Sequence, residues 1–495
     1  MWLNKGLFLD GIMFGTKLNI VKVSVLSRIA VILLQVLFNN IIPDHSPDVF
    51  QSPVQDDVTI GDVIVTRMLS GFKRWDAQYF LHIARYGYTY ENTLAFFPFY
   101  PSLIYYFATL LDSCFSYILS FHSLLLISGV LINLMCFVLS AIALHGLSNL
   151  VLKDRRAADI TVLLFCINPA SIFFSACYSE CLFSFLTFMG MWHLEKNNNI
   201  IASILFGFSS ITRSNGTISS CFVLHAEIKS LHSKLQILHD LPFEKIRYTI
   251  QWIITLFIKL LICTIPFVIF QFYTCLLYCL PQSMNLSWPE SISEYGAQRN
   301  YTLPGENPGK WCNHNIPFSY SYIQSEYWNV GFLNYYRFKQ IPNFVLCFPI
   351  VFIMISAAVS YYQKNKNFCL SLGFVTYKKK SREFFDNEDC FVYLVHSFAL
   401  TLMCFLCIHV QVIARLLASS SPVLYWVAAR TVSEEISKDH PVVGKSEFSV
   451  KLSQLISVPN NYITWHDPRT KLIFAYFLLY FLFGIIIHVN YLPWT

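Results

Sequence analysis

The chain of 495 residues is 55% hydrophobic and 17% aromatic, with only 13% charged residues, whereas soluble domains carry about 25% charged residues. This composition excludes a soluble protein and indicates a membrane protein with several spanning segments. The net charge of +6 is not concentrated in one tract, so it argues for membrane orientation rather than for nucleic-acid binding.

Fifteen cysteines raise the question of a disulfide framework. Most of them lie inside apolar runs, where a thiol behaves as a small hydrophobe. Cys404 and Cys407 form a CxxC pair, but no second pair follows at metal spacing. We therefore expect membrane-buried thiols that pack between helices, and no metal site.

The N-terminal region predicts an uncleaved signal anchor with a cytosolic N-terminus. The cations Lys17, Lys22 and Arg28 precede the first strong apolar run, residues 29–42, and cations mark the cytosolic side of a span. Residues 43–120 then form a predicted first lumenal loop with interfacial helices.

This loop carries the best candidate for catalysis, Asp76. It follows Trp75 at the start of a short segment in which Tyr79, Phe80 and Ile83 recur at helical spacing. We expect an amphipathic helix on the membrane surface, with the carboxylate at the boundary between lipid and water. That position suits an enzyme whose sugar donor hangs from a lipid. The alternative is that Asp76 merely caps a helix.

The next two apolar runs differ in length. Residues 95–111 are interrupted by Pro98 and Pro101, which favours an interfacial or re-entrant helix. Residues 124–152 are long enough to cross the membrane, and the charged residues 153–156 place the end of this helix in the cytosol.

Two ionisable residues then fall at predicted lumenal turns. Residues 160–176 and 181–194 form a predicted hairpin whose turn carries Glu180, although an ordinary helix turn explains this polarity equally well. Residues 200–224 resemble one helix, but Arg213 near its middle would cost about 3 kcal/mol inside a membrane. We therefore predict two short helices with Arg213 at the turn between them.

Residues 252–280 cross to the lumen, and residues 281–342 form the largest predicted lumenal loop. This loop contains two glycosylation sequons, at Asn285 and Asn300, which are consistent with a lumenal position. It ends in the aromatic and amide-rich run 322–336, of a kind that can stack on sugar faces.

The last part of the chain is predicted to cross the membrane at 344–361, 391–410 and 472–489, with a second lumenal segment at 410–470. Lysines near Lys378 mark the cytosol. In all we expect about ten crossings, or about eight if the half-length runs do not span. The predicted fold is thus a single all-α polytopic domain over residues 1–495.

Six motifs occur in one order: WDAQYFLHIARYGYTYENTLAFFPFYP, NPASIFFSACYSE, TRSNG, YIQSEYWNVGFLNYY, HVQVIARLLASSSPVLYW and NYLPWT. Together they closely resemble the PIG-V family of mannosyltransferases, and the resemblance covers nearly the whole chain. It implies a GT-C glycosyltransferase architecture in the endoplasmic-reticulum membrane, with the active site in the lumenal loops.

The resemblance also implies the reaction and the partners. The second mannose of the glycosylphosphatidylinositol (GPI) core would be added in an alpha-1,6 linkage from dolichyl phosphate mannose to the mono-mannosylated GPI lipid. It implies no cofactor, no nucleotide sugar and no nucleic acid, and it leaves open a small accessory membrane subunit.

An in-line displacement would convert the beta-linked mannosyl phosphate into an alpha-mannoside. It needs a base for the acceptor's 6-hydroxyl and cations for the departing phosphate. We predict Asp76 as the base and Arg213 and Arg415 as phosphate ligands, because guanidinium suits phosphate oxygens; the alternative for each arginine is a snorkelling interfacial side chain. The other predicted substrate-binding residues are Trp75, Glu91, Glu180, Trp328, Asn329, His409 and Gln411.

Two other functions fit part of the pattern. A multipass transporter or flippase would place ionisable groups near the bilayer midplane and show inverted repeats, but here the candidates gather on one face and no repeat is visible. The nearer alternative is another dolichyl-phosphate-hexose transferase that acts on a different GPI or N-glycan mannose.

Overall fold

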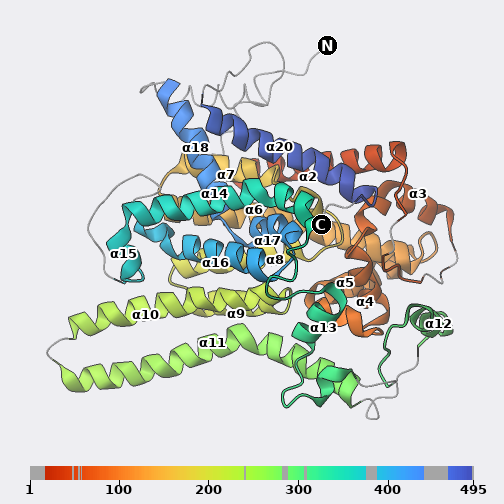
Figure 1. Cartoon of the computed structure of the whole chain (residues 1–495), viewed down its shortest axis with the longest axis horizontal. Helices are drawn as coiled ribbons and strands as arrows, with labels where there is room; N and C mark the ends of the chain where they lie inside the picture. Colours follow the sequence, from red (N-terminus) through yellow and green to blue (C-terminus); the bar gives the residue numbers. More distant parts are fainter. Residues whose placement is uncertain are drawn as a thin grey trace.

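The computed structural model describes residues 17–46, 49–53, 56, 58–238, 241–280, 288–305, 309–374, 387–439 and 467–492. The regular elements within these residues are all helical. Most of the long helices run roughly along one axis and form a bundle (Figure 1). The predicted all-α polytopic class is confirmed.

In chain order the described helices are α2 (Lys17–Ile41), α3 (Ile60–Leu69), α4 (Ala77–Tyr86), α5 (Phe99–Phe115), α6 (Phe121–Leu152), α7 (Arg155–Cys166), α8 (Glu180–Glu195), α9 (Asn199–Ser210), α10 (Ser220–Ile237), α11 (Pro242–Cys279), α12 (Glu290–Arg299), α13 (Ser319–Trp328), α14 (Ile341–Lys364), α15 (Lys366–Leu370), α16 (Phe391–Cys407), α17 (Ile413–Ser420), α18 (Val423–Asp439) and α20 (Pro468–Val489). The short 3-10 helices that matter for the site are η2 (Glu91–Ala95), η3 (Ser171–Phe174), η4 (Ser214–Ser219) and η6 (Lys310–Asn313).

Among the described residues, 6 helices are long and apolar enough to cross a membrane, namely α2, α6, α11, α14, α16 and α20. α17 and α18 meet at a bend of 77° and pass the same test together, as a broken span or a re-entrant loop. This count is lower than the expected eight to ten, because the helices of the predicted 160–194 hairpin and of the 200–224 region are too short to span. α7, α8 and α9 have 12, 16 and 12 residues, fewer than the ~20 that a span needs.

The centre of the bundle is α6, which packs against α2, α5, α7 and α8. At one side, α9, α10 and α11 form a layer of their own (Figure 1). A Cβ at Gly207 of α9 would lie 2.5 Å from the carbonyl oxygen of Ile262 in α11, so only glycine allows this approach. Glu227 of α10 and Lys259 of α11 form an ion pair at 2.6 Å, which ties the layer together.

We expected Arg28 to mark the cytosolic end of its helix, and this expectation is wrong. It lies within α2 and is only 1% exposed. Its guanidinium donates to the carbonyl oxygens of Ser171 at 2.9 Å and Cys166 at 3.1 Å. Burial of the charge is tolerated because the chain end of α7 and the loop after it supply acceptors. Arg28 therefore holds the α7–α8 loop in place.

The helix that follows Asp76, α4, is buried inside the protein and does not lie on a membrane surface. Most of its residues are buried. Phe80 packs edge-on against Phe96 and Tyr100, with ring centroids 5.2 and 5.4 Å apart, and His82 stacks on Tyr90. The apolar face that suggested a lipid contact is covered by protein aromatic residues instead.

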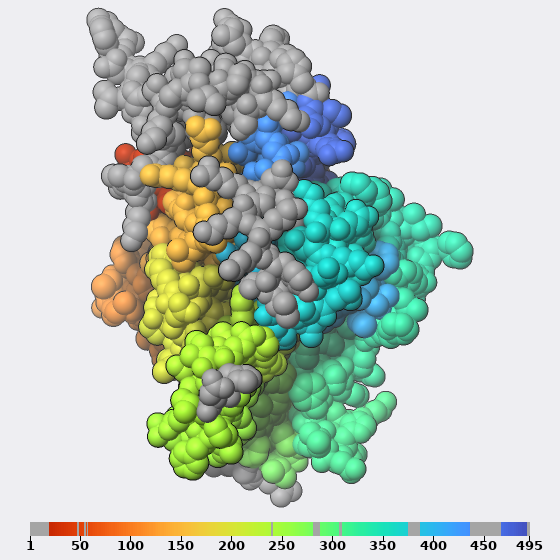
Figure 2. All heavy atoms as spheres, turned by 90° about the vertical axis from the view of Figure 1, so that its left-hand side faces the viewer, coloured from red at the N-terminus to blue at the C-terminus, as the bar shows by residue number. Residues whose placement is uncertain are grey.

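Residues 410–470 also differ from the predicted single lumenal segment. The first turns of α18 are buried inside the protein, and the indole nitrogen of Trp426 there donates to Ser148 Oγ at 2.7 Å. Glu435 near the end of α18 accepts a hydrogen bond from the backbone nitrogen of Asp467 at 2.9 Å, and the 22 residues of α20 then carry the chain about 33 Å back along the bundle. Figure 2 looks onto this end of the bundle, where α7 (gold), the α10–α11 hairpin (yellow-green) and α18 (blue) are exposed.

At the opposite end of α11, Cys279 forms a disulfide with Cys312 of η6. The sequence interpretation had missed this bond, because the two cysteines are 33 residues apart and one of them ends an apolar run. The other cysteines are free thiols, and most of them are buried, as expected.

Candidate active site

A cavity of about 930 Å³ lies at the end of the bundle where α4, α13, α17 and the α9–α10 turn meet. Its wall has a charged part and an aromatic part. The charged residues among those that line it are Asp76, Arg213, Arg299 and Arg415. Three arginines against one aspartate make the wall cationic, so it suits an anionic ligand.

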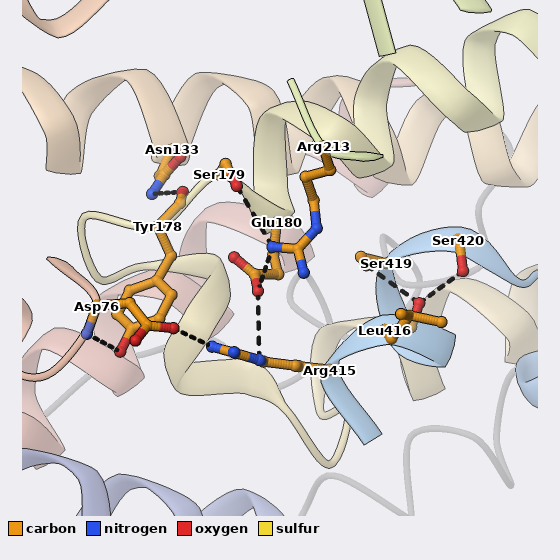
Figure 3. A network of polar contacts seen from close by, with 10 residues as sticks. All are labelled: Asp76, Asn133, Tyr178, Ser179, Glu180, Arg213, Arg415, Leu416, Ser419 and Ser420. Carbon is orange, nitrogen blue, oxygen red and sulfur yellow. Dashed lines mark hydrogen bonds and ion pairs between the residues drawn. The ribbon is translucent and has the colours of Figure 1, made fainter. Parts of the chain in front are cut away.

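Asp76, Glu180, Arg213 and Arg415 form one ionic network beside this cavity (Figure 3). Arg415 Nη1 lies 2.8 Å from Asp76 Oδ2, and Arg415 Nε lies 3.7 Å from Glu180 Oε1. Arg213 Nη1 lies 2.6 Å from the same Glu180 oxygen. The structure thus brings together four residues that the sequence placed on one face, from four separate parts of the chain.

The position of Asp76 excludes the helix-cap alternative. Asp76 stands directly before α4, but its side chain makes no capping hydrogen bond. Its carboxylate turns toward Arg415, while its backbone nitrogen donates to the hydroxyl of Tyr178 at 3.1 Å. The preceding residue, Trp75, has a left-handed backbone with φ 56°, which is uncommon for a bulky residue. This conformation sets the direction in which Asp76 points.

Glu180 is fully buried and lies behind the cavity, not in its lining. It begins α8, directly after the loop that Arg28 holds. Within that loop, the carbonyl of Tyr178 accepts a hydrogen bond from Asn133 Nδ2 at 3.1 Å. Glu180 therefore acts as a fixed anion that gathers the guanidinium groups of Arg213 and Arg415.

The rings of Phe173 and Tyr178 lie against Arg415, with the guanidinium carbon 5.4 and 5.8 Å from their centroids. Burial raises the pKa of Tyr178 well above its usual range, and the nearby Asp76 carboxylate adds to this. The Tyr178 phenol is therefore neutral and can keep its hydrogen bonds to the backbone around Asp76.

Stacked aromatic rings form the second part of the wall. Tyr79 stacks on Phe50 at 4.3 Å and on Phe96 at 4.4 Å, and Trp328 meets Phe96 edge-on at 5.9 Å. Burial raises the pKa of Tyr79 well above its usual range, so its hydroxyl remains a donor. Such rings can pack against the apolar faces of sugars, as the sequence predicted for Trp328.

His409 and Gln411 both line the cavity. His409 stacks on Tyr335 at 4.6 Å, and burial lowers its pKa, so its imidazole is neutral at neutral pH. Gln411 Oε1 accepts hydrogen bonds from Tyr335 OH at 2.8 Å and Asn343 Nδ2 at 3.0 Å. Both side chains are held by the segment that follows α13.

Glu91 and Asn329 do not line the cavity. Glu91 is 3% exposed, and its carboxylate accepts hydrogen bonds from Trp311 Nε1 at 2.8 Å and Tyr327 OH at 2.9 Å. It joins η2 to η6 and α13. Asn329 ends α13 in a left-handed conformation. Their positions indicate that they support the cavity wall and do not touch a ligand in it.

The glycosylation sequons have different outcomes. Asn285 lies outside the described residues. Asn300 is exposed at the end of α12, with a left-handed backbone, and the next residue, Tyr301, lines the cavity. The side chain of Asn300 is therefore accessible at the margin of the candidate site.

Among the residues of the cavity wall that sequence reasoning missed are Tyr178 and Asn215. Both lie in motifs that it singled out, NPASIFFSACYSE and TRSNG, but only the charged member of each motif was selected. In the described part of the chain, no three His, Cys, Asp or Glu side chains gather in a way that could hold a metal ion.

Comparison with known proteins gives a consistent result over the whole chain. Residues 17–495 match the family described as "Mannosyltransferase (PIG-V)". The chain is 39% identical to the GPI alpha-1,6-mannosyltransferase 2 of Cricetulus griseus, over 96% of this chain and 98% of that protein. It is 38% identical to the protein of the same name from Mus musculus, over 98% and 100%, and 36% identical to that from Homo sapiens, over 96% and 98%.

Proposed function

This chain belongs to the PIG-V mannosyltransferase family, and on that basis we propose that it is the GPI alpha-1,6-mannosyltransferase of the endoplasmic-reticulum membrane. In this proposal it transfers the second mannose of the GPI core from dolichyl phosphate mannose to the mono-mannosylated GPI lipid. The near-complete coverage of relatives with that name supports the proposal.

The observation that carries the chemistry is the Asp76–Arg415 contact beside two further charged groups and an aromatic wall. A lipid-linked sugar phosphate needs cations for its phosphate and flat apolar surfaces for its sugar. The cavity offers both within one space, and the side chain of Asp76 is 29% exposed there.

The proposed reaction is a single displacement with inversion. The acceptor's 6-hydroxyl oxygen forms a bond to the anomeric carbon of mannose, and the bond from that carbon to the phosphate oxygen breaks. The bonding electron pair leaves with dolichyl phosphate, and the hydroxyl proton passes to Asp76 as general base. Asp76 Oδ2 is held by Arg415, so Oδ1 is the atom assigned to the proton.

Arg415 has two tasks in this proposal. It orients the Asp76 carboxylate, and it lies within reach of negative charge that develops on the leaving phosphate. Arg213 supplies the second guanidinium. Glu180, which we predicted to bind substrate, is assigned a positioning role, because it is buried behind both arginines.

Two features support a lumenal position for the cavity. The Cys279–Cys312 disulfide lies in the loop region that builds the cavity wall, and structural disulfides persist in oxidising compartments such as the lumen of the endoplasmic reticulum. The exposed sequon at Asn300 lies on the same side. With this orientation the N-terminus of α2 lies in the cytosol.

The alternatives differ in what they require. A flippase needs a path through the bilayer, whereas the charges here are paired around one terminal cavity. A transferase for a different GPI or N-glycan mannose would use the same donor chemistry, so the acceptor decides between them.

The proposal is tested in cells that lack the second GPI mannosyltransferase. Expression of this chain should restore surface GPI proteins and convert the accumulating one-mannose intermediate into the two-mannose form. Purified protein should then transfer mannose from dolichyl phosphate mannose to the one-mannose GPI lipid. Transfer to a different acceptor only, with no two-mannose product in the cells, would contradict the proposal.

A further inference from the structure

Asn215, in the turn between α9 and α10, is placed to bind a ligand. It lines the cavity two residues after Arg213 and is only 7% exposed. Its amide nitrogen is buried and has no hydrogen-bond partner. A buried donor without an acceptor is rare and unfavourable, so a ligand in the cavity would supply what the protein does not.

Residues 212–217 of this turn are all described by the structure. Four other polar side chains of the turn line the cavity, and each already has a partner within the protein. The partner atoms are Phe208 O for Thr212 Oγ1 (2.7 Å), Tyr320 OH for Ser214 Oγ (2.7 Å), Ser214 O for Thr217 Oγ1 (2.8 Å) and Glu180 Oε1 for Arg213 Nη1 (2.6 Å). Two side-chain donors of the turn, Asn215 Nδ2 and Arg213 Nε, are buried without a partner, and they remain for a ligand.

The backbone on either side of Asn215 is fixed. A Cβ at Gly216 would lie 2.4 Å from the backbone of Ser209, so the turn is pressed directly against the end of α9. A hydrogen bond from the Gly216 nitrogen to the Arg213 carbonyl at 2.9 Å closes the turn. Asn215 consequently keeps its place in the wall and its distance from Arg213.

We propose that the Asn215 amide donates a hydrogen bond to a phosphate oxygen of the lipid-linked donor, next to the Arg213 guanidinium. This inference rests on the proposed function. A phosphate is favoured over a sugar hydroxyl because Arg213 and Arg415 both contact the same oxygen of Glu180, at 2.6 and 3.7 Å. An anion at this part of the wall would face two guanidinium groups and the amide together.

The first test is the kinetics of Asn215→Ala and Asn215→Asp. In Asn215→Ala the KM for dolichyl phosphate mannose should rise about 10-fold, as expected for loss of one hydrogen bond to a charged group. The KM for the GPI acceptor should stay the same. In Asn215→Asp the rise should be larger, because a carboxylate would face the phosphate.

The matched control is Ser219→Ala. Ser219 belongs to the same turn, is 1% exposed and also has an unpartnered side-chain oxygen, but it does not line the cavity. Its substitution should leave the KM for both substrates unchanged. If unpartnered polar atoms acted only through folding, the KM values of the two variants would change alike. Loss of a ligand contact changes the KM of the Asn215→Ala variant alone.

Dolichyl phosphate, which carries the phosphate without the mannose, separates the two parts of the donor. Its inhibition constant in Asn215→Ala should rise by the same factor as the KM for the donor. An unchanged KM, or a raised KM with an unchanged inhibition constant, would overturn the inference and leave the proposed function standing. Thermal denaturation of the purified protein with dolichyl phosphate tests the same contact without any transfer of mannose. A failure of the proposed transferase function can therefore be distinguished from a failure of the Asn215 contact.

Discussion

Arg415 Nη1 and Asp76 Oδ2 lie 2.8 Å apart, although 339 positions separate the two residues in the chain. The contact joins the start of α4 to α17, two elements that lie far apart in the sequence. It holds one carboxylate oxygen in a fixed direction at the wall of the cavity.

The first prediction concerns Asp76. Asp76→Asn keeps the shape of the side chain but removes its basicity, so the transfer rate should fall by roughly 10²- to 10⁴-fold. Protein yield should change little, because the carboxylate makes no helix cap. Asp76→Glu should recover only part of the rate, since the longer side chain displaces the carboxylate. The measurement is mannose transfer at matched protein levels, and near-normal turnover of Asp76→Asn would remove Asp76 as the base.

The second prediction concerns Arg415. Arg415→Lys keeps the charge but loses the planar donor pattern that reaches Asp76 and Glu180 together, so activity should fall at least tenfold, or about 1.4 kcal/mol in the barrier. Arg430→Lys is the control, because Arg430 pairs with the half-exposed Glu434 one turn away on α18. A pair of that kind contributes at most about 0.5 kcal/mol. Equal activities of the two variants would argue against a special role for Arg415.

The third prediction concerns Glu180. Glu180→Gln leaves two guanidinium groups without their shared buried anion, so the free energy of unfolding should fall by about 3–5 kcal/mol. The double variant Glu180→Gln, Arg213→Gln should lose less unfolding free energy than the sum of the two single variants. In the double variant no arginine at position 213 is left without its partner. Thermal denaturation in detergent measures both. Strictly additive effects would show that the contact is not energetically coupled.

The fourth prediction concerns the disulfide. Maleimide should label neither Cys279 nor Cys312 in the unreduced protein, and both after reduction under denaturing conditions. Cys279→Ser should free Cys312 for labelling and lower stability by up to about 4 kcal/mol, the chain-entropy estimate for a loop of this size. Cys275→Ser, one turn earlier in α11 and a free thiol, should do neither. Labelling of both cysteines without reduction would contradict the bond.

The fifth prediction concerns the side of the membrane. Asn300 should carry an N-glycan that Asn300→Gln removes, with a matching shift in mobility after glycosidase treatment. Asn285 is expected to behave in the same way. A sequon inserted next to Lys378 should stay unmodified, since this stretch is expected in the cytosol. Modification there would reverse the orientation of the whole bundle.

Much of the site could be predicted from the sequence because charged residues are rare in this chain. Each of the four residues Asp76, Glu180, Arg213 and Arg415 interrupts or flanks an apolar run. Because successive crossings alternate between the two sides of the membrane, the order of the runs placed these residues on one face. The structure adds which of these four side chains contact one another, and the order of the crossings cannot predict this. Glu91 shows the limit, because its partners Trp311 and Tyr327 lie more than two hundred positions away.

The features that the sequence did not predict depend on long-range packing. Arg28 appeared to be a cytosolic charge because its acceptors are carbonyls and serine hydroxyls at and after the end of α7, which lie far away in the sequence. α4 appeared to lie on a membrane because a helix covered by aromatic side chains has the same periodicity as one covered by lipid. Asn215 was overlooked because only the charged residue of its motif, Arg213, was selected.

The left-handed backbone of Trp75 has a consequence for engineering. A bulky residue in this conformation is strained by about 1–2 kcal/mol, and Trp75→Gly would relieve that strain. The same change would remove the indole from the cavity wall and from its contact with Tyr491, and it would free Asp76 to rotate toward the first turn of α4 and cap it. The backbone strain at Trp75 is therefore linked to the direction of the Asp76 carboxylate, and a variant with a more relaxed backbone would be a poorer catalyst.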